Sequence, residues 1–521
     1  MFGNGPIMDA FSVAFRIPNF VRRLFGEGAL TAAFLPAFVR DMERHGEVSA
    51  WRLASAMLSL LTFVLIALVL LGEGILWVVS EQFDLSQEAQ LLTSLAAIML
   101  PYLILICLAA MVSAMMHALG HFLWPALVPV ILNLTWIAGI WGVARNYTDP
   151  NTQVHVIALA VVVGGVLQFA VPLPRLWSLG FRYQRDWFRP AGEIRADSAV
   201  APPRADTDDA AVMPKVRHIT RGMLPVLLGL SITQLNSLLD SFIAWGLSQP
   251  EIPGPHDFAW PVESGTASAL YLGQRMYQFP LGVFGIALGT VLFPLLARHS
   301  ERNRADLLGA DLTMGIRLVL WVGIPASAGL ILLSEPLTQL LFQYDRFDAA
   351  DAQQTATMIA AYGLGVWAYC GLLILHRGFY AIGDQMSPMY VGMVAMLVNT
   401  VLNFALIWVL GGKGLAIGTA LVSSAQAIVV TWLLHRKVGH LSGRQIAQTG
   451  VRTVIATLVM SVACFLTLRS LPENLSLPMR ILRVFAPVAV AMVTFMAMSV
   501  ALQMQEWREL LNRKSPDDDV A

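Results

Sequence analysis

The run Met57-Leu-Ser-Leu-Leu-Thr-Phe-Val-Leu-Ile-Ala-Leu-Val-Leu-Leu71 decides the fold class, because it contains no charged residue. It lies inside a longer apolar segment, 52–80, and a helix needs about 20 apolar residues to cross the hydrocarbon core of a bilayer. A segment exposed to lipid must satisfy its backbone internally, and the alternation typical of a barrel strand is absent. The run therefore predicts a transmembrane helix.

The composition extends this conclusion to the whole chain. Of its 521 residues, 56% are hydrophobic and 13% are charged, with a mean hydropathy of +0.64. Soluble domains carry about 25% charged residues, so an ordinary soluble protein is excluded. The 34 basic and 34 acidic residues cancel, and nothing in this balance indicates nucleic acid as a partner. Cys107, Cys370 and Cys464 lie far apart in apolar runs, which argues against a disulfide framework or a zinc site.

Apolar segments of spanning length recur along the chain and are separated by turn residues or charge. We predict an all-α polytopic membrane protein with about 13 transmembrane helices. The predicted spans are 7–40, 52–80, 88–119, 122–145, 153–179, 218–247, 263–297, 307–333, 353–381, 386–410, 414–436, 447–470 and 479–505.

Basic residues gather in alternate loops, and this pattern predicts the orientation. The segment 180–217 is the most basic, whereas 80–88 and 248–262 hold no Lys or Arg. The C-terminus is then cytoplasmic and the N-terminus external. An odd span count with an external N-terminus and no preceding signal predicts that a first helix is missing from this chain.

The stretch Ala201-Pro-Pro-Arg-Ala-Asp-Thr-Asp-Asp-Ala210 has the composition of a linker and divides the chain into two helical halves. Paired bundles are the usual plan of a transporter, so we expect two pseudo-symmetric lobes. The predicted divisions are an N-terminal lobe (1–180), a cytoplasmic linker (181–217), a C-terminal lobe (218–437), two extra C-terminal helices (438–508) and a cytoplasmic tail (509–521).

The first predicted span has the densest set of intramembrane charges. A helix with such a polar stripe must line a water-filled cavity, and its ionisable groups are functional candidates. Guanidinium groups suit a phosphate-bearing ligand, because the planar fork binds phosphate bidentately and keeps its charge. Alternatively, Arg22 and Arg23 anchor a helix end by snorkelling. The candidate residues are Asp9, Arg16, Asn19, Arg22, Arg23 and Glu27.

Arg275 is the second candidate, deep in the span 263–297 and flanked by Gln274 and Gln278. No acidic residue is near it in the sequence, so it needs an anionic ligand or a carboxylate from another helix. A structural ion pair with Asp9 or Glu27 is the alternative to a ligand role. Together with the arginines of the first span, Arg275 predicts a cationic cavity shared between the two halves.

A third set combines one carboxylate with amide and hydroxyl oxygens. Asp240 lies in the span 218–247, Asn399 and Asn403 are four residues apart, and Thr419 is on the following span. Such oxygens suit a sodium ion or a proton relay. Interhelical hydrogen bonding is the alternative, which we favour for Asn403 and Thr419. No Walker motif, nucleophile elbow or metal-ligand cluster is present, so ATP-driven pumping and hydrolysis have no support.

One segment closely resembles the signature of the MurJ/MviN family: Asp9-Ala-Phe-Ser-Val-Ala-Phe-Arg-Ile-Pro-Asn-Phe-Val-Arg-Arg-Leu-Phe-Gly-Glu-Gly28. Members of this family are lipid II flippases of the multidrug/oligosaccharidyl-lipid/polysaccharide exporter superfamily. The segment 274–294 is similar to a second family motif, and 341–347 and 377–384 match two later blocks. The resemblance covers essentially the whole chain.

The resemblance implies a two-lobed fold of fourteen helices, the last two lining a groove for the polyprenyl tail. The substrate is then lipid II, flipped outward across the bacterial cytoplasmic (inner) membrane by alternating access for peptidoglycan and cell-wall synthesis, with no catalysis. The family's cavity arginines correspond to Arg22 and Arg275, with Arg23, Asp9 and Glu27 in the same motif. We expect a monomer among membrane lipids, with the cell-wall synthesis machinery as a candidate partner and no cofactor other than a sodium ion.

This chain departs from the family pattern in two places. Family members begin with a helix that carries further cavity arginines, and this sequence starts after that helix. The residues Asp240, Asn399, Asn403 and Thr419 resemble a proposed sodium site, but that site often has a second carboxylate where this chain has Asn403. Membrane potential or a sodium gradient is the implied driving force.

Other functions make different demands on the sequence. A flippase for another polyprenyl-linked oligosaccharide needs the same cationic cavity and is the nearest alternative. A cation-coupled drug exporter predicts acidic and aromatic pockets in place of arginines. A membrane glycosyltransferase needs catalytic carboxylates in an external loop, and 248–262 shows no such pattern.

Overall fold

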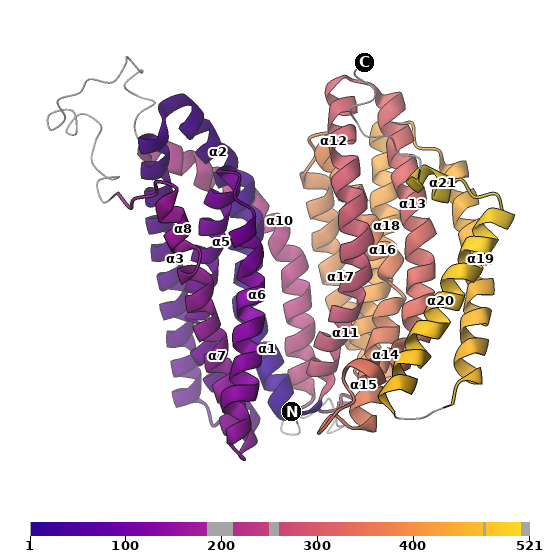
Figure 1. The fold of residues 1–521 in the computed structure, drawn as a ribbon, viewed down its shortest axis with the longest axis horizontal. Helices are drawn as coiled ribbons and strands as arrows, with labels where there is room; N and C mark the ends of the chain where they lie inside the picture. Colours follow the sequence, from indigo (N-terminus) through magenta and orange to yellow (C-terminus); the bar gives the residue numbers. More distant parts are fainter. Residues whose placement is uncertain (1, 185–211, 250–259, 473–475, 512–521) are drawn as a thin grey trace. The chain divides into compact units, whose positions relative to one another are not determined.

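A computed structural model describes residues 2–184, 212–249, 260–472 and 476–511, and all their regular structure is helical (Figure 1). Most of the predicted linker 181–217 and tail 509–521, and most of the external loop 248–262, lie outside the described residues.

Ten of the predicted spans agree with the structure. Among the described residues, nine helical segments are long and apolar enough to cross a membrane, and a pair of helices bent by 44° makes a tenth. The three other predicted spans, 7–40, 218–247 and 263–297, are also helical. The prediction of an all-helical polytopic membrane protein is confirmed.

The chain divides into two compact units, and the division falls inside a helix. Unit 1 comprises Met1–Gly5 and Leu239–Ala521, and unit 2 comprises Pro6–Leu238. The chain therefore passes between the units twice, at Gly5–Pro6 and at Leu238–Leu239. The lobe boundaries inferred from the sequence stay a prediction.

Unit 2 is built from the helices of the N-terminal part of the chain (indigo to magenta in Figure 1). They are α1 (Pro6–Val21), the π-helix η1 (Arg22–Ala29), α2 (Leu30–His45), α3 (Glu47–Gln82), α4 (Gln87–Met99), α5 (Tyr102–Ala118), α6 (Leu123–Ala138), η2 (Gly139–Val143), η3 (Ala144–Asn146), α7 (Pro150–Ala170), α8 (Leu173–Ser178) and most of α10 (Val212–Leu247).

The contact between α5 and α7 shows how helices of unit 2 associate. In a membrane the lipid is as apolar as the side chains, so close packing and hydrogen bonds must hold the helices together. Tyr102 is fully buried, and its hydroxyl donates to Gln168 Oε1 (3.3 Å). Gln168 Nε2 in turn donates to the carbonyl of Val128 on α6 (2.8 Å). Gly165 lies against the Tyr102 ring, where a Cβ atom would come within 2.5 Å of Cδ2. Small residues and interhelical hydrogen bonds are what membrane helices use to associate.

Unit 1 contains the remaining helices. They are the end of α10, α11 (Thr266–Pro280), the π-helix η6 (Leu281–Ile286), α12 (Ala287–Glu301), α13 (Ala305–Leu332), α14 (Ser334–Leu341), α15 (Ala349–Gly363), α16 (Val366–Ala381), α17 (Met386–Leu410), α18 (Lys413–Val438), α19 (Gly443–Ser470), α20 (Leu477–Ala501) and α21 (Glu506–Leu511).

The core of unit 1 lies between α12, α13, α16 and α18, and includes Leu312, Ile374, Phe379 and Leu434. The last two long helices, α19 and α20, pack against each other, and α19 also packs on α13 (Figure 1). A second apolar cluster holds them there, with the Trp321 indole donating to Ser499 Oγ (3.1 Å). The extra C-terminal helices predicted from the sequence are thus attached to unit 1 through α13 and α14.

We expect Gly165→Ala to destabilise the protein, because its new methyl group would displace the Tyr102 ring, which a hydrogen bond to Gln168 holds in place. Overpacking of this kind costs about 1 to 3 kcal/mol. The measurement is the apparent melting temperature in detergent. Gly74→Ala on α3 is the control, since its Cβ would meet no atom within 4 Å. Equal melting temperatures for the two variants would contradict the packing described above.

Candidate functional site

The charged residues predicted in the first span are on α1 and η1. Asp9 and Arg16 are buried in unit 2, with 1% and 8% of their surface exposed. Arg16 Nη1 donates to both the carbonyl oxygen (3.0 Å) and the Oγ (2.7 Å) of Ser237 on α10. This arginine therefore joins α1 to α10, a packing role that its sequence position does not reveal.

Arg22 and Arg23 begin the π-helix that follows α1. Such wide helical turns are uncommon and occur often at functional sites. Arg22 Nε donates to Asn19 Oδ1 (3.2 Å), and Arg23 Nη1 donates to Gln234 Oε1 on α10 (2.9 Å). Both arginines thus have an amide partner that helps to orient the guanidinium group. The side chain of Glu27, predicted as a partner of Arg23, lies outside the described residues.

The partners on α10 were not predicted from the sequence. Gln234 and Ser237 are three residues apart, and Asp240 follows after three more. Residues at this spacing lie on neighbouring positions of one helix face. The periodic polar positions in an otherwise apolar helix were the signal that could have identified them.

Arg275 lies on α11 and is exposed. Its Nη2 donates to the hydroxyl of Tyr271 (2.8 Å) and its Nη1 to Oε1 of Gln278 (3.3 Å). The guanidinium carbon is also 5.0 Å from the centre of the Tyr271 ring. Among the described residues of unit 1, no carboxylate forms an ion pair with Arg275. Gln278 was predicted, whereas Tyr271, one turn before the arginine, was not.

The structure brings together the four residues predicted as a cation or proton site, although Asp240 is far from the others in the sequence. Asp240 Oδ1 accepts from Asn403 Nδ2 (2.7 Å), and Oδ2 accepts from Thr419 Oγ1 (3.0 Å). Asn399 contacts both Asn403 (3.2 Å) and Thr419 (3.4 Å). Asp240, Asn399 and Asn403 are buried. The set therefore has one negative charge surrounded by neutral oxygen-bearing side chains.

The described residues contain no group of three or more His, Cys, Asp or Glu side chains that could hold a metal ion. One carboxylate balances the charge of a monovalent cation and not that of a divalent one. The four side chains around Asp240 thus suit sodium or a proton better than calcium or zinc.

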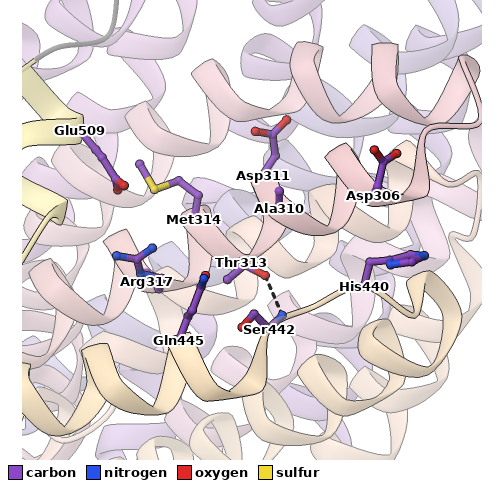
Figure 2. A pocket seen from close by; sticks show the side chains of 10 residues that line it. All are labelled: Asp306, Ala310, Asp311, Thr313, Met314, Arg317, His440, Ser442, Gln445 and Glu509. Atoms are coloured by element: carbon purple, nitrogen blue, oxygen red, sulfur yellow. Dashed lines mark hydrogen bonds between the residues drawn. The ribbon is translucent and has the colours of Figure 1, made fainter.

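A groove of about 700 Å³ lies elsewhere in unit 1, beside α13 and α21 (Figure 2). Asp311, Arg317, His440 and Glu509 are among its lining residues, and none of the predicted site residues lines it. Two of the charged residues on α13 contact other side chains of unit 1: Asp311 Oδ2 is 2.9 Å from His299 Nδ1, and Arg317 pairs with a carboxylate of α21. We therefore assign these charges a structural role.

The carboxylate that pairs with Arg317 is Glu506, at the start of α21. Arg317 Nη2 and Nε lie 2.8 and 3.0 Å from its Oε1, and Thr449 Oγ1 donates to the same oxygen (2.6 Å). Burial raises the pKa of the Glu506 carboxyl, but the hydrogen bonds and the charge of Arg317 lower it more, so the pKa lies below its usual value. This network holds α21 against α13 and α19.

Comparison with known proteins identifies the family that the chain matches. The family model described as "Lipid II flippase MurJ" matches residues 1–486. A "Probable lipid II flippase MurJ" of Vibrio cholerae is 32% identical over 456 residues, which cover 85% of this chain and 78% of the relative. A "Lipid II flippase MurJ" of Burkholderia cenocepacia is 31% identical over 421 residues, 80% of this chain and 75% of the relative.

Solved structures agree in fold. The structure titled "Lipid II flippase MurJ, inward closed conformation" has a TM-score of 0.72 at 19% identity and covers 98% of this chain and 94% of that one. An inward-facing MATE family transporter of the MOP superfamily has a TM-score of 0.65 at 14% identity, covering 84% of this chain and 92% of that one. The architecture is thus shared with transporters of this superfamily.

We expect Glu506→Gln to lower the free energy of unfolding by about 3 kcal/mol, because Arg317, only 14% exposed, loses the charge that compensates it. The folded-state pKa of Glu506 lies below its unfolded value. Its stabilisation is therefore present at neutral pH and lost as the pH falls below about 4.3, the ordinary value for Glu. Denaturant unfolding at pH 7 and at pH 4 measures both effects.

Glu43→Gln is the matched control, since Glu43 is exposed on α2. It should change neither the stability nor its pH dependence. A Glu506→Gln variant as stable as the wild type at pH 7 would rule out the network as an anchor for α21.

Proposed function

This chain belongs to the lipid II flippase MurJ family, and we propose that its guanidinium groups on η1 and α11 bind the phosphate groups of lipid II while the lipid is flipped. The protein is a lipid II flippase that serves peptidoglycan synthesis, and it is a multi-pass membrane transporter and not an enzyme. The residues proposed to contact phosphate are Arg22, Arg23 and Arg275, with Asp9, Arg16, Asn19, Glu27 and Gln278 around them.

The surroundings of Arg275 are the main support for this proposal. Placing a charged side chain inside a membrane costs free energy, so such a residue is expected to have a function. The groups around it indicate whether that function is structural or ligand binding. Arg275 is exposed, it is oriented by Tyr271 and Gln278, and no described carboxylate of unit 1 neutralises it. Arg317, by contrast, is paired with the buried carboxylate of Glu506. A guanidinium group held by neutral partners keeps its full charge for an anionic ligand.

The chemistry of the ligand suits this arrangement. Lipid II is linked through a pyrophosphate, whose oxygens accept paired N–H donors from a planar guanidinium fork. At Arg275 the amide and hydroxyl partners are neutral and can be exchanged for a ligand at small cost. Reversible binding of this kind is what a transporter needs, since it must release the lipid after each cycle.

We further propose that the protein lies in the bacterial cytoplasmic membrane as a monomer, with its C-terminus in the cytoplasm. The basic residues of alternate loops support this orientation. Lipid II then moves from the inner to the outer leaflet by alternating access of the two units, close to the cell-wall synthesis machinery that consumes it.

Asp240 is proposed to couple this movement to sodium. Its carboxylate, the Asn399 and Asn403 amide oxygens and the Thr419 hydroxyl would hold the ion, which would supply the charge that balances the buried carboxylate. A proton on Asp240 would balance the same charge and is the alternative. The single carboxylate supports a weak, monovalent site.

Arg275→Glu should abolish complementation of a strain depleted of its lipid II flippase, because it places a negative charge where phosphate is to bind. Arg275→Lys keeps the charge but loses the fork, and should lower the flipping rate about 10- to 100-fold, the range of a lost charge-assisted hydrogen bond. Complementation, expression level and externally accessible lipid II are measured together. Arg302→Glu in the exposed loop before α13 is the control. Full rescue by Arg275→Glu would remove Arg275 from the phosphate site.

Asp240→Asn should remove the dependence of flipping on a sodium gradient in proteoliposomes, while flipping down a lipid II gradient persists. Asn403→Asp should raise the sodium affinity roughly tenfold or more, because affinity rises with the number of charged ligands. The measured quantity is the initial flipping rate against sodium concentration at constant pH. A rate that follows pH in place of sodium would favour the proton, and a rate indifferent to both would exclude coupling through Asp240.

A further inference from the structure

Gly3 and Asn4 are held by unit 1, although the helix that follows them belongs to unit 2. Met1–Gly5 groups with Leu239–Ala521, and α1 begins at Pro6. This helix leads into the arginines proposed to bind phosphate. The attachment of residues 3–4 therefore determines where the proposed substrate-binding helix begins.

Both ends of the Asn4 side-chain amide are hydrogen-bonded in this attachment. Its Nδ2 donates to the carbonyl of Asp351 (3.1 Å), to Gln354 Oε1 (3.1 Å) and to Thr355 Oγ1 (2.9 Å). Its Oδ1 accepts from Ser268 Oγ (3.2 Å). Thr355 and Ser268 are both 0% exposed. Two helices of unit 1, α11 and α15, thus form a buried polar socket for one amide.

The backbone around Asn4 fits this socket closely. Gly3 has a φ of +70°, and a Cβ there would lie 2.5 Å from Asp351 Oδ2 and 2.8 Å from the Arg346 carbonyl oxygen. Gly265, with a φ of +86°, faces Asn4, and its Cβ would lie 2.8 Å from that of Asn4. Gly5, by contrast, has no atom within 4 Å of such a position. The close fit therefore ends at Asn4, directly before the chain enters unit 2.

The strength of the attachment suits a contact that opens and closes. All four hydrogen bonds join neutral groups, and each such bond shifts an equilibrium by roughly a factor of five. Together they favour the state in which residues 3–4 are bound to unit 1 over the released state by roughly several hundredfold at most. A ligand that discriminates between two conformations by about 10⁴ can reverse that preference.

The chain is too short here for α1 to move far while Asn4 stays seated. Only Gly5 separates Asn4 from Pro6, and two residue steps extend about 7 Å at most. We propose that Gly3, Asn4 and the socket of Ser268, Gln354 and Thr355 form a latch, which ties the start of α1 to unit 1 in this structure and is released in each transport cycle. This inference rests on the alternating access proposed above.

A disulfide across the latch tests its release. The three native cysteines are replaced by alanine, and Asn4→Cys is combined with Thr355→Cys, whose side chains would be adjacent. Oxidation should lower the flipping rate in proteoliposomes at least tenfold, and reduction should restore it. Thr313→Cys with Ser442→Cys, a second contact inside unit 1, is the control pair and should flip equally in both states. Undiminished flipping by the cross-linked protein, or failure of Asn4→Cys and Thr355→Cys to cross-link, would overturn the latch.

A labelling experiment tests the closed latch without depending on transport. Thr355→Cys is buried beneath Asn4 and should react slowly with a maleimide. Adding Asn4→Ala should raise the labelling rate roughly tenfold, because the segment then loses all four hydrogen bonds. Adding Gly5→Ala, one residue away in open space, should leave the rate unchanged. Equal rates with Asn4→Ala and Gly5→Ala would show that Asn4 does not hold the segment, whatever the outcome of the flipping assays.

Discussion

Polar side chains inside a bilayer must find partners within the protein, and α10 provides such partners along its length. In unit 2 its Gln234 and Ser237 accept hydrogen bonds from arginines of α1 and η1. Three residues beyond Ser237, Asp240 is held in unit 1 by Asn403 and Thr419. The polar face of α10 thus continues across the point where the chain passes between the units. Without such contacts Arg16 and Asp240 would be buried at high cost.

The partners of each arginine distinguish structural from ligand-binding charges. Arg317 meets the buried carboxylate of Glu506, which neutralises it and anchors the short C-terminal helix, and it also donates to a threonine. Arg275 meets a tyrosine and a glutamine, which orient it, and no described carboxylate of unit 1 forms an ion pair with it. The latch at Asn4 is also built from neutral groups. The Asn4 amide can therefore leave its socket without exposing an uncompensated charge.

Much of the fold could be predicted, because hydropathy is a property of short segments. Ten predicted spans agree with described helices. The break at Pro101 between α4 and α5, inside the predicted span 88–119, was not predicted. The set around Asp240 was also foreseeable, since isolated polar residues in apolar helices tend to meet one another. The roles of Ser237, Gln234 and Tyr271 were not foreseen. Serine, glutamine and tyrosine are common in membrane helices, so only their contacts in the folded protein identify their roles.

The sequence by itself determined that this chain is an all-helical membrane protein, that arginines lie within its spans, and that it is similar to the lipid II flippases. The transfer free energy of each segment and the side chains it contains are local quantities, so they can be calculated without a fold. Only the tertiary structure decided that Arg16 serves packing, that Arg275 lacks an anionic partner among the described residues of unit 1, and that Asn4 is seated between α11 and α15. Those outcomes depend on how each helix is rotated about its axis and on the register of helices distant in sequence, which no local pattern specifies.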